Sequence, residues 1–574
     1  MASVKDILLW TVARPVARTA LCHADWQVHR FMRDLGRCRA VQDRLLMRII
    51  RAGEGSDFAR GHGFSRIRSY PDFACAVPVA QYSYHESYIE RCRQGDLRAL
   101  FGPSQKLLMF ALTSGTTGSP KYIPVTAGSM AAYRLGWNIW IAKYLADHPQ
   151  AYVRRLLQVS NPMAGESTPG GHPCGSISTE LARRQKRIVQ HFYATPPEVA
   201  SIAEMQARYY VTMRFALMAD LGTIITANPS TLLVLAQTIE KNASSLIRDI
   251  HEGGIDESIG LPASLRSRLV RRLRPNRKKG RQLERLLAMH GRLLPRDCWD
   301  PAAVAHWTGG TVGLYLPQVR REYGDRPIRD IGLLASEGRM SIPLQDNTPA
   351  GVLDIQANFY EFVPQEELDS AGVAGDSPTL PPGLTILRAD ELREGCEYFV
   401  LLTNQAGLYR YHIGDLVRVT DHLGSAPVIE FLSRGAHTSS LTGEKLTEHQ
   451  VVMAVNGVLR DADLCVATFT MAPVWAEPPY YQLSLEGGEL CRPEVLSRLA
   501  ERIDERLGQV NLEYRSKRCG RRLGPLRTLQ TPDSAQTGAD SARRPIYAVR
   551  HEQHKHRFLQ NRPIEPEVHQ ERLL

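Results

Sequence analysis

Apolar and polar positions follow one another along the chain in an order that predicts a mixed α/β fold. Three apolar runs have the length of buried strands and are separated by long segments with helical periodicity: KLLMFALTS (106–114), GTIITAN (222–228) and IRDIGLLAS (328–336). Residues 1 to about 100 alternate helical stretches with short polar breaks. Strands that alternate with helices are typical of α/β proteins. We therefore expect a large N-terminal domain in which helices flank β-sheets.

From residue 351 the pattern changes to short runs rich in β-forming residues, which predict a β-rich subdomain. The runs are VLDIQANFYEFVP (352–364), EYFVLLTN (397–404), LYRYHIGDLVRVT (408–420) and APVIEFLS (426–433). The segment QEELDSAGVAGDSPTLPPG (365–383) lies between the first two runs and has the composition of a loop.

After Arg434 the pattern changes again and predicts a small α+β domain. We expect a helix at 448–459, strands at 465–471 and 480–486, and a helix at 493–507. GAHTSSLTG (435–443) is the expected junction, and 531–545 has the composition of a flexible loop. The predicted domains are therefore 1–434, a large N-terminal domain, and 435–574, a small C-terminal domain.

Length and composition exclude several protein classes. The chain has 574 residues, 43% of them hydrophobic and 23% charged, which favours two or more ordered domains over a disordered or fibrous protein. No apolar run reaches the roughly 18 residues that a membrane span needs. Asp6, Arg14 and Arg18 interrupt the apolar N-terminus, so it indicates an amphipathic helix pair and no secretory signal. Ten scattered cysteines without a C-x-x-C motif favour a cytoplasmic location over a zinc or disulfide framework.

The positive charge is concentrated in one segment. Residues 266–296 hold twelve Lys or Arg and one acid, Glu284, an excess equal to the net charge of +11 of the whole chain. Pro275 and Gly280 interrupt the run, and the leucine spacing predicts two amphipathic helices. Two interpretations stay open: a solvated helical hairpin, or a surface that contacts an acidic membrane, nucleic acid or acidic protein. Because no aromatic stacking platform accompanies the segment, no nucleic-acid partner is expected.

The segment that indicates chemistry is LTSGTTGSPKYIPVT (112–126). An apolar strand leads directly into glycines and hydroxyl side chains, and the loop ends at Lys121. Glycines allow a close approach of the backbone to a polyphosphate, and hydroxyls beside backbone N–H groups donate to it. The order Gly115-Thr-Thr-Gly118-Ser-Pro-Lys121 does not fit the phosphate-binding loop G-x-x-x-x-G-K-[ST].

At these residues the chain resembles the adenylate-forming superfamily, the firefly-luciferase-like enzymes that activate carboxylates with ATP. Residues 113–121 fit its phosphate-loop pattern. Ala335-Ser336-Glu337 resembles the segment whose glutamate holds Mg²⁺, although the family's preceding aromatic residue is Leu334 here and its first serine is Ala335. Residues 409–415, YRYHIGD, resemble the segment whose aspartate, here Asp415, binds the ribose hydroxyls.

Within that superfamily the chain resembles the auxin-responsive acyl acid amido synthetases, and among them the bacterial relatives. The resemblance runs through residues 56–102, LYRYHIGD (408–415) and SLTGEKLTEHQV (440–451). It implies two half-reactions: a carboxylic acid and ATP form acyl-adenylate and pyrophosphate, and an amine, commonly an amino acid, then takes the acyl group and releases AMP. It also implies that positioning and charge neutralisation dominate catalysis.

The resemblance implies a set of site residues. Those expected at the nucleotide are Thr113, Ser114, Gly115, Thr116, Thr117, Lys121, Gly310, Ala335, Ser336, Asp415 and Arg434, and those expected in catalysis are Glu337, Lys445 and Lys555, with Glu337 also the Mg²⁺ ligand. For Lys121 a phosphate contact and a structural role stay equally open, and for His412 a structural role is favoured. A mobile C-terminal domain that presents Lys445 and Lys555 in different half-reactions is a hypothesis.

Two alternatives stay open. An acyl-CoA ligase shares the phosphate loop, and a non-catalytic scaffold would use the basic segment to bind an anionic surface. The glycine-rich segment 161–184 either shapes the acyl or nucleotide site or forms a surface loop.

Overall fold

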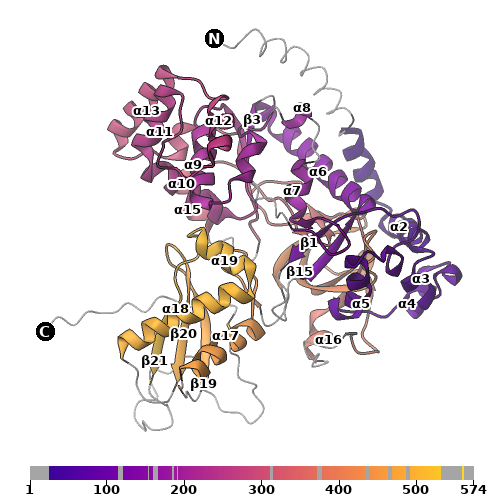
Figure 1. The fold of residues 1–574 in the computed structure, drawn as a ribbon. Coiled ribbons are helices and arrows are strands. Elements are labelled where there is room, and N and C mark those ends of the chain that lie inside the picture. The colour runs from indigo at the N-terminus through magenta and orange to yellow at the C-terminus, as the bar shows by residue number, and fades with distance from the viewer. Residues whose placement is uncertain are drawn as a thin grey trace. The chain divides into compact units, whose positions relative to one another are not determined.

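The computed structural model describes residues 23, 25–113, 121–152, 154–159, 166–183, 187–190, 192–309, 315–370, 378–434, 438–462, 464, 468–486, 492–531 and 559–560. One compact unit lies within Met1–Thr113 and Tyr122–Leu432. The other lies within Ser433–Leu574, and Lys121 is assigned to it as well (Figure 1). Helices and several sheets make up the first, and helices on a sheet make up the second, which confirms the predicted α/β class. Most of the predicted N-terminal helix pair, residues 435–437 of the predicted 435–443 junction and most of the 531–545 loop lie outside the described residues.

None of the helices in the described stretches combines the length and the apolar character that crossing a lipid bilayer requires.

The described residues among the first hundred form helices, as predicted. They include α2 (Cys38–Gly53), α3 (Asp57–Gly61), α4 (Tyr70–Ala76) and α5 (Tyr82–Arg93). Polar side chains fix where these helices begin: the Ser56 side chain accepts from the Ala59 amide at the start of α3, and Ser69 and Asp72 form a capping box at the start of α4.

The predicted strand at 106–114 is β1 (Leu107–Thr113), which lies between β2 (Lys121–Thr126) and β4 (Cys174–Gly175) in a small sheet. β1 and β4 run parallel. The long helix α6 (Ala127–Asp147) follows β2 directly, because Thr126 and Ser129 form a capping box at its first turn. The described part of segment 161–184 contains β4 and α7 (Ile177–Arg183).

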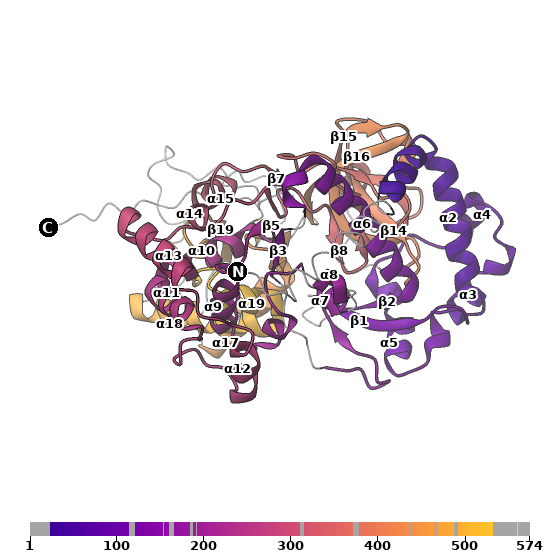
Figure 2. The same cartoon turned by 90° about the horizontal axis from the view of Figure 1, so that it is seen from above.

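A parallel sheet forms the other half of the first unit. Its strand order is β3-β5-β6-β7, with β3 (Arg155–Gln158), β5 (Leu221–Ile225), β6 (Ala303–Ala305) and β7 (Ile328–Arg329). The associated helices are α8 (Arg187–Gln190), α9 (Met205–Ala216), α10 (Pro229–Lys241), α11 (Ala243–Glu252), α12 (Ala263–Val270), α13 (Arg277–His290), α14 (Pro295–Cys298) and α15 (Leu316–Tyr323). Figure 2 shows α9, α10, α11 and α13 gathered on one side of β5.

The basic segment forms two helices, α12 and α13, as predicted, but Gly280 does not interrupt it. Gly280 lies buried inside α13, where an added Cβ would be 2.5 Å from Nε2 of His251 on α11. A glycine here allows α13 to pack closely on α11, and this packing outweighs the weak helix propensity of glycine.

The single strand predicted for 328–336 was wrong. The run is divided into β7 and β8 (Leu334–Ala335), and β8 pairs with β9 (Gly338–Arg339). The division has a local cause: Asp330 accepts hydrogen bonds from the Gly332 and Thr308 amides, and Gly332 adopts a φ of +89°. A left-handed residue ends a strand, and the side chain of Asp330 replaces the lost backbone partners.

The β-rich subdomain is one sheet of order β10-β11-β16-β15-β14-β12-β13. Its strands are β10 (Ser341–Ile342), β11 (Gly351–Leu353), β12 (Phe359–Pro364), β13 (Leu387–Arg388), β14 (Glu397–Thr403), β15 (Tyr411–Leu423) and β16 (Ala426–Arg434). β14 is buried on both faces, with Val400 and Leu402 in the main core and Phe399 and Leu401 in a second cluster. The predicted loop at 365–383 begins instead with a helix, α16 (Gln365–Ser370).

The second unit contains the predicted series of helix, strand, strand and helix, with two short strands before it and a helix and a strand after it, and its elements have the following bounds. They are β17 (Thr438–Ser439), β18 (Leu446–Thr447), α17 (Glu448–Asp461), β19 (Thr468–Val474), β20 (Tyr480–Glu486), α18 (Pro493–Val510), α19 (Leu512–Cys519) and β21 (Arg527–Thr531). β20 pairs antiparallel with β19 and parallel with β21, and α17 and α18 lie together beside this sheet (Figure 1). Val451, Val455, Ile503 and Leu507 pack in its core.

Candidate functional site

Glu337 lies at the turn between β8 and β9 and is 3% exposed. Two contacts hold this turn. The Asn404 side chain donates to the Glu337 carbonyl oxygen at 2.8 Å, and the Tyr411 hydroxyl donates to Glu337 Oε1 at 3.4 Å. The neighbouring Ala335 carbonyl oxygen accepts from the Tyr133 hydroxyl of α6 at 3.3 Å. The turn that carries Ala335, Ser336 and Glu337 is thus fastened to α6 and to the start of β15.

Two buried ionisable residues, Arg339 and Asp354, lie close to this turn. The Arg339 guanidinium lies over the Trp137 ring at 4.7 Å and donates to the Ile331 carbonyl oxygen at 2.8 Å. Burial lowers the pKa of Arg339 and raises that of its neighbour Asp354. An added Cβ at Gly136 would come within 2.4 Å of Arg339 Cδ, so α6 approaches the pair closely. The sequence patterns did not indicate this pair.

Asp415 lies in an irregular part of β15. The pairing of β14 with β15 shifts between Phe399↔Leu416 and Leu401↔His412, and Gly414 adopts a φ of +84°. Bulges of this kind redirect side chains and are frequent beside functional sites. Asp415 is 3% exposed. The buried carboxylate is therefore placed by a local distortion that the glycine of the HIGD sequence permits.

The start of β15 is fixed by a buried ion pair. Arg410 Nη2 lies 2.8 Å from Glu361 Oε1, with side-chain exposures of 6% and 1%. Arg410 also donates to the carbonyl oxygens of Ala74 and Val77, both at 2.9 Å, and the Tyr70 hydroxyl donates to Glu361. Arg410 adopts a φ of +46°, which explains why the strand predicted from 408 begins at Tyr411. Sequence reasoning missed this pair, although a charge inside an apolar strand run was a usable signal.

The phosphate-loop residues are only partly described. Thr113 ends β1 and Lys121 begins β2, whereas Ser114, Gly115, Thr116 and Thr117 lie outside the described residues, as do Gly310 and Lys555. Arg434 is the last residue of β16. Of the predicted site residues in the first unit, Glu337 contacts the segment that carries Asp415 through the Tyr411 hydroxyl. Thr113 lies in the β2-β1-β4 sheet, whereas Asp415 lies in the sheet that contains β15.

Lys445 belongs to the second unit, in the turn between β17 and β18, and adopts a φ of +49°. The preceding Glu444 is fully buried and fastens this turn. Its carboxylate accepts from the Leu441 and Thr442 amides at 2.5 and 2.7 Å, and from the Tyr481 hydroxyl at 2.6 Å. A carboxylate that accepts several hydrogen bonds rigidifies the loop around it, so Glu444 holds the backbone from which Lys445 projects.

Lys517 on α19 provides a pH-dependent prediction for the second unit. Burial, with the nearby positive charge of Arg522, lowers its pKa from 10.5 to about 7. Between about pH 7 and pH 10.5 the Lys517 side chain is protonated to a greater extent in the unfolded chain than in the folded chain. This residue therefore makes the free energy of unfolding rise with pH over that range. We expect Lys517→Met to stabilise the protein more at about pH 7 than at about pH 9.5, as measured by urea unfolding. Lys241→Met, at an exposed lysine of α10, is the control, and an equal gain at both pH values would contradict the assignment.

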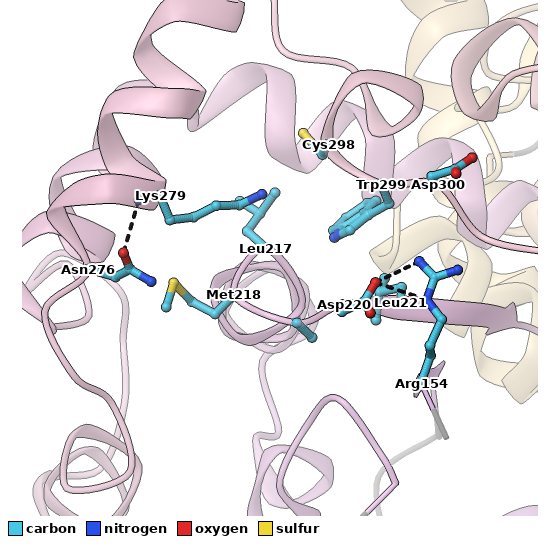
Figure 3. A pocket seen from close by; sticks show the side chains of 11 residues that line it. Arg154, Leu217, Met218, Asp220, Leu221, Asn276, Lys279, Cys298, Trp299 and Asp300 are labelled. Carbon is cyan, nitrogen blue, oxygen red and sulfur yellow. Dashed lines mark hydrogen bonds and ion pairs between the residues drawn. The ribbon is translucent and has the colours of Figure 1, made fainter. Parts of the chain in front are cut away.

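The first unit contains a cavity of about 280 Å³. Its lining residues Arg154, Leu221 and Asp300 lie at or just before the amino ends of β3, β5 and β6 (Figure 3). Arg154 donates to Asp220, and Lys279 of α13 extends between Leu217 and Cys298. Among the predicted site residues that the structure describes, none lines this cavity. Ligands of parallel α/β sheets bind at the carboxyl ends of the strands, so we assign no role to it.

Comparisons with known proteins agree along nearly the whole chain. Among curated relatives, a jasmonoyl–L-amino acid synthetase of Nicotiana attenuata is 25% identical over 488 residues, covering 81% of this chain and 82% of the relative. A jasmonoyl–L-amino acid synthetase of Oryza sativa subsp. japonica is 24% identical, covering 88% and 90%. An indole-3-acetic acid-amido synthetase of Arabidopsis thaliana is 23% identical, covering 85% and 86%.

A solved structure of the acyl acid amido synthetase AtGH3.15 in complex with 2,4-DB shares the fold, with a TM-score of 0.64, 18% identity and coverage of 88% of this chain and 89% of that one. Family models match in three consecutive parts: the GH3 family N-terminal domain at residues 27–328, the central domain at 351–434 and the C-terminal domain at 449–563. The N-terminal model alone covers more than half of the chain, and the chain therefore belongs to the GH3 family.

Proposed function

We propose that this chain is an ATP-dependent acyl acid amido synthetase. It activates a carboxylic acid as an acyl-adenylate, releases pyrophosphate, and transfers the acyl group to an amine, an amino acid in the first instance, with release of AMP. The observation that carries this proposal is membership in the GH3 family across all three of its domains. The names of the relatives, which are amino acid synthetases of jasmonate and indole-3-acetic acid, support amide formation over the acyl-CoA ligase alternative.

Glu337 is the residue that we propose as the ligand of Mg²⁺. This ion is usually held by one or two carboxylates together with substrate phosphates. Among the described residues no group of three or more His, Cys, Asp or Glu could hold a metal by itself, and a single buried carboxylate such as Glu337 suits an ion that reaches the site with the nucleotide. The chemistry that the ion would supply is neutralisation of phosphate charge.

The other site residues keep their predicted roles within this proposal. The phosphates are bound by Thr113, Ser114, Gly115, Thr116, Thr117 and Lys121, and the adenine is bordered by Gly310, Ala335 and Ser336. Asp415 binds the ribose hydroxyls, and Arg434 binds ribose or phosphate. From the C-terminal domain, catalysis is assisted by Lys445 and Lys555. We retain the domain division 1–434 and 435–574.

We also propose a cytoplasmic location, since the seven described cysteines are all free thiols. Cell fractionation would check it.

The reaction is tested in two steps. ATP–pyrophosphate exchange is measured across a panel of carboxylic acids that includes aryl acids, jasmonate-like oxylipins and fatty acids. The best acid is then incubated with amino acids, other amines or coenzyme A, and the products are identified by mass spectrometry. Consumption of the acyl-adenylate by coenzyme A alone would select an acyl-CoA ligase. Absence of exchange with every acid would select a non-catalytic scaffold.

Asp415→Asn is expected to raise the KM for ATP about 10- to 100-fold, because an amide replaces one acceptor oxygen of the carboxylate by an NH2 donor and removes its negative charge. The measurement is the exchange rate as a function of ATP concentration. Asp421→Asn, at an exposed aspartate of the same strand, is the control and should leave KM unchanged. An unchanged KM in Asp415→Asn would remove this residue from the ribose site.

A further inference from the structure

The α12–α13 hairpin presents a basic face to solvent. We define the basic face by six exposed side chains, Arg268, Arg271, Arg277, Lys278, Arg281 and Arg285. Figures 1 and 2 show α13 at the outer edge of the helical group to which it belongs. Neither the fold of the unit nor the proposed reaction requires these six charges.

Most of the other basic residues of the segment have protein partners. Arg272 pairs with Glu198 at 2.6 Å, and Arg266 donates to carbonyl oxygens at 255 and 256. The only acid of the segment, Glu284, lies 3.0 Å from His251 Nε2. Within the described part of the chain, no acidic side chain forms an ion pair with a member of the basic face. Its charge is therefore available to an external partner.

The apolar side of the hairpin is already covered. Leu265, Leu269, Leu273 and Leu283 are all buried, and α13 packs on α11 through Gly280. A partner that binds an amphipathic helix in a groove needs this apolar side. Because the first unit occupies it, recognition of the hairpin is left to the side chains that it exposes to solvent.

The positions along α13 point to the kind of partner. Arg277, Arg281 and Arg285 follow one another at four-residue spacing and lie on one side of the helix. One turn further, Met289 is 74% exposed. A row of arginines that ends in an exposed apolar side chain suits an anionic lipid surface, where the cations meet headgroups and the apolar side chain enters the interface. Single-stranded nucleic acid would require aromatic stacking partners beside the charges, and the basic face contains none.

We propose that the basic face of α12–α13 binds the surface of membranes that contain anionic lipids. The contact is reversible and depends on the number of charges, and it is independent of the proposed enzyme activity. Each basic residue near such a surface raises partitioning about fivefold. Loss of three therefore lowers the partition coefficient roughly 100-fold.

The test is co-sedimentation of the full-length protein with vesicles of phosphatidylcholine alone or with about 30% phosphatidylserine. We expect binding only to the vesicles with phosphatidylserine, and loss of binding in about 0.5 M salt. R277Q/R281Q/R285Q should lose binding roughly 100-fold, whereas R277K/R281K/R285K, which keeps the charge, should retain it. R498Q/R502Q/R506Q removes three exposed arginines at the same spacing from α18 and should bind like the unaltered protein.

A second variant tests the lipid contact separately from charge. Met289→Ser should weaken binding to phosphatidylserine vesicles several-fold without changing its salt dependence. Equal binding to both kinds of vesicle, or unchanged binding by R277Q/R281Q/R285Q, would overturn the proposal. Complete displacement from vesicles by an amount of RNA that matches the lipid in phosphate would overturn it in favour of a nucleic-acid surface. Circular dichroism spectra of all variants check that the hairpin remains folded.

Discussion

Glu337→Gln is expected to lower the rate of acyl-adenylate formation about 100- to 1,000-fold while leaving the protein folded. An amide of the same size cannot supply the negative charge that a magnesium–phosphate complex requires. The fold should tolerate the change because the 2.8 Å hydrogen bond from Asn404 is accepted by the backbone carbonyl oxygen of residue 337, which the substitution leaves in place. The rate is measured by ATP–pyrophosphate exchange at saturating acid, with the magnesium concentration varied.

The matched control is Glu394→Gln, at an exposed glutamate of the same unit, which should keep full exchange activity. The thermal midpoints of both variants should lie close to that of the unaltered protein. If Glu337→Gln exchanged pyrophosphate at the normal rate, the metal assignment would be wrong even though the family assignment would stand.

Arg410→Met is expected to have the largest effect on stability, a loss of about 3–5 kcal/mol in the free energy of unfolding. The substitution leaves Glu361, which is 1% exposed, as a buried charge without its cation. It also leaves the carbonyl oxygens of Ala74 and Val77 without the guanidinium that donates to them. The change is measured as a shift of the urea midpoint, because a chain of several domains need not unfold in two states.

A more exposed ion pair further along β15 provides the comparison. Arg418 lies 2.6 Å from Glu397, but their side chains are 44% and 29% exposed, so Arg418→Gln should cost less than about 1 kcal/mol. The double variant Arg410→Met with Glu361→Leu should regain part of the lost stability, since it removes both buried charges. Equal losses in Arg410→Met and Arg418→Gln would show that burial of the pair does not matter.

Periodicity predicted those parts of the fold that depend on local sequence. Strands β1, β5 and β20 and helices α17 and α18 lie where apolar spacing placed them. The prediction failed where a contact distant in sequence, or a single side chain, decides the backbone. Asp330 divides an apolar run that otherwise has the composition of one strand, and Gly280 continues a helix because α11 packs against it. Neither effect is visible in the residues of the segment alone.

The candidate site was predicted unevenly for a similar reason. Glu337, Asp415 and Lys445 were predicted because each lies in a short sequence motif, and a motif is defined by residue types at fixed spacing. The residues that support them were not selected, since Arg410 and Glu361 are 49 positions apart and Glu444 is held partly by Tyr481, 37 positions away. Contacts of this kind depend on how strands and turns meet in space. Only the presence of Glu361 and Arg410 within otherwise apolar runs indicated that a buried partner was needed.

The contacts between the start of β15 and the α4–α5 segment have a consequence for biosynthesis. Arg410 binds Ala74 and Val77, which are 336 and 333 positions earlier in the chain. At ribosomal rates of about 5–20 residues per second, the early segment emerges roughly 20 to 70 s before its partner is made. During that interval the first helices carry apolar surface that the later strands will cover. The large unit can therefore reach its native packing only when translation has passed its last strand, whichever of its elements form first.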